Sequence, residues 1–172
     1  MEDKSSFLVL PGREYKSYGY PDLDVCMYRT GINTGVKRID EKVNTATEEN
    51  GHLYIGDIVQ EDALRLNLNR GNGTLNPRQF IDLKGLLEKG IDQEEKVLYP
   101  DGKEIDKGIL ERVYDEIFGL REPVRGEFID ASFKLNNGVL YLNQDHKIVN
   151  GLLVPEYSRP LLESYLTKTC FI

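Results

Sequence analysis

The chain has 172 residues and a mass of 19.7 kDa, with 22 Lys and Arg against 29 Asp and Glu, so its net charge is −7. We expect a single domain of this length to bury enough apolar surface to fold without disulfides or structural zinc. The acidic balance and the absence of a Lys/Arg-rich run disfavour a general binder of nucleic acids. The apolar runs are far shorter than the roughly 20 residues of a membrane-spanning helix, so we expect no membrane insertion.

The first residues are acidic and polar, and only four apolar residues, Phe7 to Leu10, follow them. This pattern does not resemble a signal peptide, so we expect a cytoplasmic protein. Cys26 and Cys170 lie almost a chain length apart, and in the reducing cytosol we expect both to be thiols.

Residues 1–56 are expected to form a part rich in strands and loops. A short apolar strand ends at Pro11-Gly12, and alternation of apolar and polar residues predicts a second strand from Asp22 to Tyr28. The segment Thr30–Asn50 is polar and is either a long loop or a weak hairpin. Asn50-Gly51 is a hairpin-turn dipeptide, so His52 to Ile55 could return as a strand.

Residues 57–119 are expected to be helical, with helices over about 57–69, 77–90 and 107–118. The second helix has the clearest start. Asn76 is a good N-cap, Pro77 suits the first helical position, and Gln79 completes a capping box. Gly90 is expected to end this helix, and Asp106 to cap the next one.

Residues 126–172 are expected to form a β-meander followed by a helix. Phe128 to Leu135 alternates as a strand, and Asn137-Gly138, Asn143 to His146 and Asn150-Gly151 are expected to be turns between four strands. Ser158 would cap a last helix that packs on the sheet. We therefore predict a single α+β domain, 1–172, with an antiparallel meander in its C-terminal third packed against three to four helices.

A charged segment joins the third helix to the meander and contains Arg121, Arg125, Glu127 and Asp130. Strand alternation places Glu127 on the apolar face, where a carboxylate needs a cationic partner. One interpretation is an ion-paired joint between helix and sheet. The other is a site in which the arginines bind a small acidic ligand or Glu127 acts as a general base.

Three tyrosines, Tyr15, Tyr18 and Tyr20, lie in one predicted loop. They could form an aromatic platform for a partner, because tyrosine suits surfaces that are partly apolar and partly wet. The alternative is that they pack over the sheet.

The standard motifs for phosphate binding, zinc hydrolysis and serine hydrolysis are missing, and no cofactor is indicated. Both histidines, His52 and His146, fall in or beside predicted turns, where we expect exposed side chains. A weaker hypothesis is a metal site that combines His146 with Asp22 or Asp24. Nothing local places a serine beside either histidine.

Two functional hypotheses follow. The first is a binding or assembly module that presents the tyrosine loop and the Thr30–Asn50 segment to a protein partner or to a second copy of the chain. The alternative is a small metal-assisted hydrolase or phosphoester-processing enzyme. It would use carboxylates chosen among Asp22, Asp24, Glu127 and Asp130, with His146.

Overall fold

The computed structural model describes residues 4–27, 46–49, 52–55, 59–69, 71–119 and 129–161. It mixes helices with antiparallel strands and has a strand-rich C-terminal third, as predicted. The chain divides into two compact units: unit 1 contains residues 1–58 and 81–127, and unit 2 contains residues 59–80 and 128–172. The interpretation of the chain as one domain stays a prediction.

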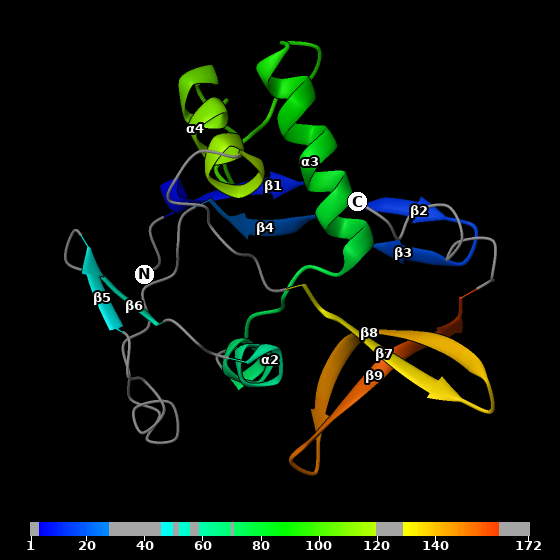
Figure 1. Ribbon diagram of the computed structural model, residues 1–172. Helices are drawn as coiled ribbons and strands as arrows, with labels where there is room; N and C mark the ends of the chain where they lie inside the picture. The colour runs from blue at the N-terminus through cyan, green and yellow to red at the C-terminus, as the bar shows by residue number, and fades with distance from the viewer. Residues whose placement is uncertain are drawn as a thin grey trace. The chain divides into compact units, whose positions relative to one another are not determined.

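Short antiparallel pairs make the β-structure of unit 1 (Figure 1). The short 3-10 helix η1 (Lys4–Ser6) precedes the first of them. The pairs are β1 (Phe7–Leu10) with β4 (Leu23–Cys26), β2 (Arg13–Tyr15) with β3 (Tyr18–Tyr20), and β5 (Ala46–Glu49) with β6 (His52–Ile55). The strand before Pro11-Gly12 and the strand after Asn50-Gly51 are therefore confirmed. Of the predicted Thr30–Asn50 loop, only β5 lies within the described residues.

The tyrosine loop was predicted as irregular, and this is wrong. Its residues form the β2–β3 hairpin, in which Tyr15 pairs with Tyr18 and Arg13 pairs with Tyr20.

Two helices contribute to the core of unit 1: α3 (Pro77–Ile91), from Ile81 onward, and α4 (Lys107–Phe118). The backbone also connects distant segments, because the amide of Val9 donates to the carbonyl of Leu98 at 2.9 Å. The fully buried apolar side chains come from β1, the residue after β4, α3, α4 and the segment between the helices. They are Leu8, Leu10, Met27, Leu83, Leu86, Leu87, Val97 and Val113.

Gly90 does not end α3, contrary to the prediction. The helix continues to Ile91, and the residue with a positive φ is Gln93, at 61°. A Cβ atom at Gly90 would lie 2.5 Å from Val97 Cγ2 and 2.9 Å from Leu110 Cδ1. Glycine is therefore needed here for close packing and not for the chain reversal.

Unit 2 contains α2 (Gln60–Asn69) and a three-stranded antiparallel sheet. The strands are β7 (Ala131–Asn136), β8 (Val139–Val149) and β9 (Leu152–Pro160), in that spatial order. Both connections are two-residue Asn-Gly turns with positive φ at each residue: 48° and 78° at 137–138, and 51° and 79° at 150–151. These are the type I′ turns that the sequence predicts.

The meander has three strands and not four. The polar run Asn143 to His146 was predicted to be a turn, but it lies inside β8, which pairs with β7 on one side and β9 on the other. Pairing with a strand on each side stabilises the extended chain despite its polarity. Ser158 lies in β9 opposite Asn143, so its predicted role as a helix cap is also wrong. Residues 162–172 lie outside the described residues.

Asn76 forms the predicted capping box at the start of α3. Its side-chain oxygen accepts from the amides of Arg78 and Gln79, both at 3.0 Å, and its own amide donates to the side-chain oxygen of Gln79 at 2.9 Å. Asn76 is fully buried, and its Nδ2 also donates to Asp145 Oδ1 in β8 at 2.8 Å. One side chain therefore completes the helix start and satisfies a carboxylate oxygen of the sheet.

Replacing Asn76 with Ala should cost more stability than removing an ordinary cap. The exposed cap Asp106, which accepts from the amide of Gly108 at 2.8 Å, is a matched control. We expect Asp106→Ala to cost about 1 kcal/mol and Asn76→Ala about 2 to 3 kcal/mol, because Asp145 also loses a buried donor. Urea unfolding of both variants measures the difference, and equal losses would contradict the coupling.

Candidate functional site

The charged segment predicted as a ligand site is described at one position only. Arg121, Arg125 and Glu127 lie outside the described residues, whereas Asp130 lies immediately before β7 and is 5% exposed. Asp130 was expected to face away from the apolar side of the strand. Its burial shows that it lies in the interior of unit 2.

Two tyrosines of the β2–β3 hairpin, Tyr15 and Tyr20, bond to Asp82, and the ring of Tyr18 lies near that of Tyr20. Asp82 Oδ2 accepts from the hydroxyl of Tyr15 at 2.6 Å and from that of Tyr20 at 2.8 Å, and Arg13 lies 3.7 Å from the other oxygen. The rings of Tyr18 and Tyr20 are 6.0 Å apart. Burial raises the pKa of Tyr20, and the bond to Asp82 raises it further. Tyr15 and Tyr20 therefore anchor the hairpin to α3, which favours the packing interpretation for these two rings.

Replacing Tyr20 with Phe should destabilise unit 1 by about 2 kcal/mol, because a hydrogen bond to a buried carboxyl group is lost. Tyr141→Phe in β8 is the control, since no described residue bonds the Tyr141 hydroxyl. Thermal melts followed by circular dichroism test this prediction. Equal stability of the two variants would mean that the bonds to Asp82 contribute little.

Of the residues of the metal hypothesis, Asp22 and Asp24 belong to unit 1 and His146 belongs to unit 2. Asp22 Oδ1 accepts from the amide of Gly12 at 2.7 Å, and Asp24 is exposed in β4. Within the described part of the chain, no three His, Cys, Asp or Glu side chains are grouped to hold a metal ion. None of the described helices is long and apolar enough to span a membrane.

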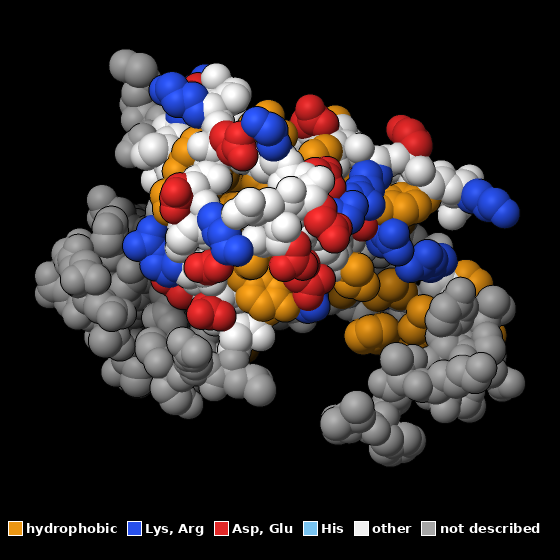
Figure 2. Space-filling model, turned by 90° about the horizontal axis from the view of Figure 1, so that it is seen from above, with side chains coloured by type: hydrophobic (Ala, Val, Ile, Leu, Met, Phe, Trp, Pro, Cys, Tyr) orange, Lys and Arg blue, Asp and Glu red, His pale blue; other side chains and the backbone are white. Residues whose placement is uncertain are grey.

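Charged side chains of both signs are interspersed on the face shown in Figure 2. A shallow hollow between α3 and α4 is lined by several acids, among them Glu88, Asp92 and Glu111. Glu88 is already bound there by Lys84 at 2.5 Å and by the hydroxyl of Tyr114 at 2.9 Å. This arrangement is typical of a paired helix surface.

The interior of unit 2 is unusually polar. Its buried apolar side chains among the described residues are Ala63, Leu64, Leu66 and Leu142. Its buried polar side chains are at least as numerous: Asn76, Gln79, Asp130, Asn143 and Gln144. Buried polar groups cost stability unless they are hydrogen bonded, so such a cluster indicates either a structural network or a site.

His146 is bound by Asp130 at two points and contacts a serine. Its Nδ1 hydrogen bonds to Asp130 Oδ1, and its backbone amide donates to Asp130 Oδ2 at 2.8 Å. Its Nε2 lies 3.3 Å from Oγ of Ser132, a half-buried residue of β7. The side chains of His146 and Asp130 are only 7% and 6% exposed. His146 is therefore not the exposed turn residue that we predicted.

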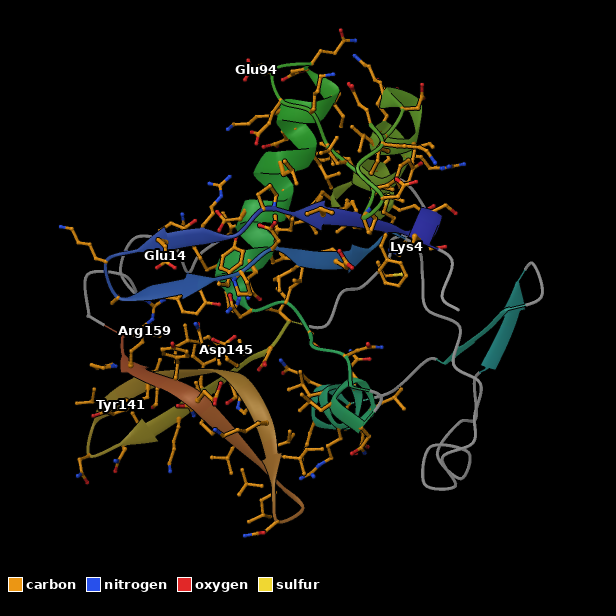
Figure 3. All side chains as sticks on the ribbon, turned by 180° about the vertical axis from the view of Figure 1, so that it is seen from behind. Lys4, Glu14, Glu94, Tyr141, Asp145 and Arg159 are labelled. Atoms are coloured by element: carbon orange, nitrogen blue, oxygen red, sulfur yellow. The ribbon has the colours of Figure 1, made fainter. Side chains whose placement is uncertain are left out.

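A backbone irregularity at Asp145 allows this contact. Ser132 is paired with Asn143, so strict alternation would place His146 on the opposite face of the sheet from Ser132. Asp145 has a φ of 54°, so the chain departs from extended geometry between Gln144 and His146, although both residues keep their register with β9. The imidazole thus reaches Ser132 and Asp130. Figure 3 shows Asp145 on the sheet, with Tyr141 earlier on the same strand.

Asp145 itself is an incompletely satisfied carboxyl group. Oδ1 accepts from Asn76, but Oδ2 is buried without a hydrogen-bond partner among the described residues. Burial raises the pKa of Asp145 above its ordinary value, and the charges of Asp130 and Glu156 raise it further, against the bonds from Asn76 and Gln144. Ionisation of Asp145 therefore opposes folding.

Asp145→Asn should stabilise the chain at pH 7. The pKa of Asp145 is higher in the folded chain than in the unfolded chain, so the protonated carboxyl group stabilises the fold fully below pH 3.8, its ordinary pKa. This stabilisation is lost as the pH rises through the pKa of the folded state. Asparagine cannot ionise and tolerates a positive φ. Melting temperatures from pH 3 to 8 should show a gain at pH 7 that disappears below pH 3.8. The exposed Asp24→Asn, as control, should show no such gain.

The outer edge of β7 is the second notable feature of unit 2. The side chains of Phe133 and Leu135 are 67% and 71% exposed and share one face of the strand. Asn136 and Val139 flank the two-residue turn and form a hydrogen-bonded pair, and such pairs alternate along an antiparallel ladder. The backbone N–H and C=O groups of Phe133 and Leu135 therefore point away from β8. The carbonyl of Ala131, two residues earlier, points to the same outer side and accepts from Gln60 Nε2 at 2.8 Å.

The other edge of the sheet is less suited to pairing. β9 contains Pro155 and Pro160, which lack an amide hydrogen, and prolines protect edge strands from further pairing. β7 contains no proline, and its one charged residue is Lys134. The two edges therefore differ in their capacity to accept another strand.

No protein-family model, curated protein or solved structure matches the chain. Sequence reasoning missed the Ser132–His146–Asp130 cluster because its members come from two strands. A weak signal existed in Asp-x-Ser at 130–132, since residues two apart in a strand share a face.

Proposed function

We propose that the chain is a protein-binding module that accepts an extended segment of a partner along β7. The observation that supports this proposal is the edge of β7, where exposed apolar side chains and outward backbone groups alternate. Strand addition uses these two elements: main-chain hydrogen bonds give affinity, and alternate side chains give specificity.

The exposed side chains of β7 are large enough to matter. Phe133 and Leu135 lie two residues apart on the same face, so a partner strand could place two apolar side chains beside them. Burial of an aromatic or leucine side chain contributes about 1.5 to 3 kcal/mol. Lys134 lies on the opposite face of the strand and would favour a partner that carries an acidic side chain there.

The proposed binding surface differs from those expected from the sequence, which were the tyrosine loop and the Thr30–Asn50 segment. The tyrosine hairpin is tied to Asp82 through Tyr15 and Tyr20, and most of Thr30–Asn50 lies outside the described residues. Both stay predictions as partner surfaces. The metal-assisted hydrolase and the cytoplasmic location also stay predictions.

Phe133→Glu should weaken partner binding without unfolding the chain, because exposed substitutions usually change stability by less than about 0.5 kcal/mol. Leu152→Glu is the matched control: Leu152 is 65% exposed, against 67% for Phe133, and lies in β9 of the same sheet. The probe is a display library of linear peptides selected on the full chain. We expect enriched peptides with alternating apolar residues, bound at least tenfold more weakly by Phe133→Glu and equally well by Leu152→Glu.

Hydrogen exchange locates the bound peptide. The amides of Phe133 and Leu135 should gain protection on binding, whereas those of β9 should not. Peptides that bind Phe133→Glu as well as the wild type would contradict the proposal. In sedimentation equilibrium, a dimer that Phe133→Glu dissociates would show that the added strand comes from a second copy of the chain.

A further inference from the structure

We propose that Ser132 is a nucleophile, activated by His146 and oriented through Asp130, that can transfer an acyl group from a small ester. The inference does not rest on strand addition at β7, because the three side chains belong to the interior and opposite face of the same sheet. It assigns a chemical role to the polar cluster of unit 2.

The hydrogen bonds determine which imidazole nitrogen can act as a base. Nδ1 hydrogen bonds to the carboxylate of Asp130, so in the neutral imidazole the proton lies on Nδ1. Nε2 then carries the free lone pair and lies 3.3 Å from Ser132 Oγ. The second oxygen of Asp130 accepts from the His146 amide at 2.8 Å, which fixes the carboxylate relative to the ring.

The arrangement has the connectivity that activates serine in unrelated folds: carboxylate to Nδ1, and Nε2 to hydroxyl. The buried positions of Asp130 and His146 shield their bond from water, which strengthens it. Ser132 is half-buried and therefore retains access to solvent. Its distance to Nε2 is typical of a site that tightens when substrate binds.

The reaction balances with these groups alone. Ser132 Oγ forms a bond to the acyl carbon while the ester C–O bond breaks, and the hydroxyl proton passes to His146 Nε2 and then to the leaving alcohol. Water next attacks the acyl carbon and gives its proton to Nε2. Ser132 Oγ departs and recovers that proton. Asp130 is a positioning residue, because it acts through His146.

The sheet provides a matched control serine. Asn143 is flanked by Ser132 on β7 and by Ser158 on β9, so both serines occupy equivalent positions beside the same residue of the central strand. No hydrogen bond joins Ser158 to a histidine within the described residues. Ser158 is exposed whereas Ser132 is half-buried, so faster reaction of Ser132 reports the effect of His146 and not easier access.

The decisive experiment uses a fluorophosphonate probe on the full-length chain, with the modified residue mapped by mass spectrometry. Serine oxygen attacks phosphorus, fluoride leaves, and His146 takes the proton. We expect Ser132 to be labelled about 100-fold faster than Ser158, within the range of general-base assistance. Ser132→Ala should abolish labelling and Ser158→Ala should not. His146→Ala should lose labelling, and added imidazole should restore part of it.

Two further measurements separate chemistry from folding. Wild-type chain mixed with 4-nitrophenyl acetate should release a burst of one nitrophenolate per chain. In ¹⁵N spectra, His146 should carry its proton on Nδ1, and Asp130→Asn should shift the proton toward Nε2 while slowing labelling. Labelling of wild-type Ser132 no faster than Ser158 would overturn the proposal. So would labelling that is unchanged in a folded His146→Gln variant.

Discussion

The geometry of unit 2 depends on the side chain of Asn76. This buried amide accepts from two amides of α3 and donates to Asp145 in β8, so the start of the helix and the irregular point of the strand share one residue. The positive φ at Asp145 in turn determines where His146 lies. An apolar residue at position 76 would leave helix donors and a carboxylate oxygen unsatisfied together, which is why a small amide is needed here.

β7 separates two proposed roles by simple alternation. Phe133 and Leu135 lie on one face of the strand, and Ser132 lies on the other with its contact to His146. A strand has a side-chain period of two, so adjacent residues can serve different surfaces without interfering. The polar interior supports the proposed role of Ser132 as a nucleophile, and the exposed edge supports the proposed binding of a partner strand.

The features that the sequence predicts correctly are those that depend on neighbouring residues. The capping box at Asn76, the cap at Asp106 and both Asn-Gly turns of the sheet need only local hydrogen bonds and local backbone preferences. The wrong predictions concern segments whose conformation depends on partners distant in the sequence. The local sequence of Asn143 to His146 predicts a turn, but hydrogen bonds to two flanking strands and to Asp130 hold it extended. The local sequence at Ser158 predicts a helix cap, but pairing with β8 places it in a strand. Proximity of Ser132 to His146 requires both the strand register and the irregularity at Asp145.

The two Asn-Gly turns also determine how the sheet of unit 2 can assemble. Each connects antiparallel strands through two residues, so every ladder contact between β7, β8 and β9 joins segments that are close in sequence. Hairpins of this kind form in about 1 to 10 μs, because little chain entropy is lost on closure. The β1–β4 pair of unit 1 closes a longer loop. We therefore expect the C-terminal sheet to nucleate by itself, with Ser132 and His146 brought together early in folding.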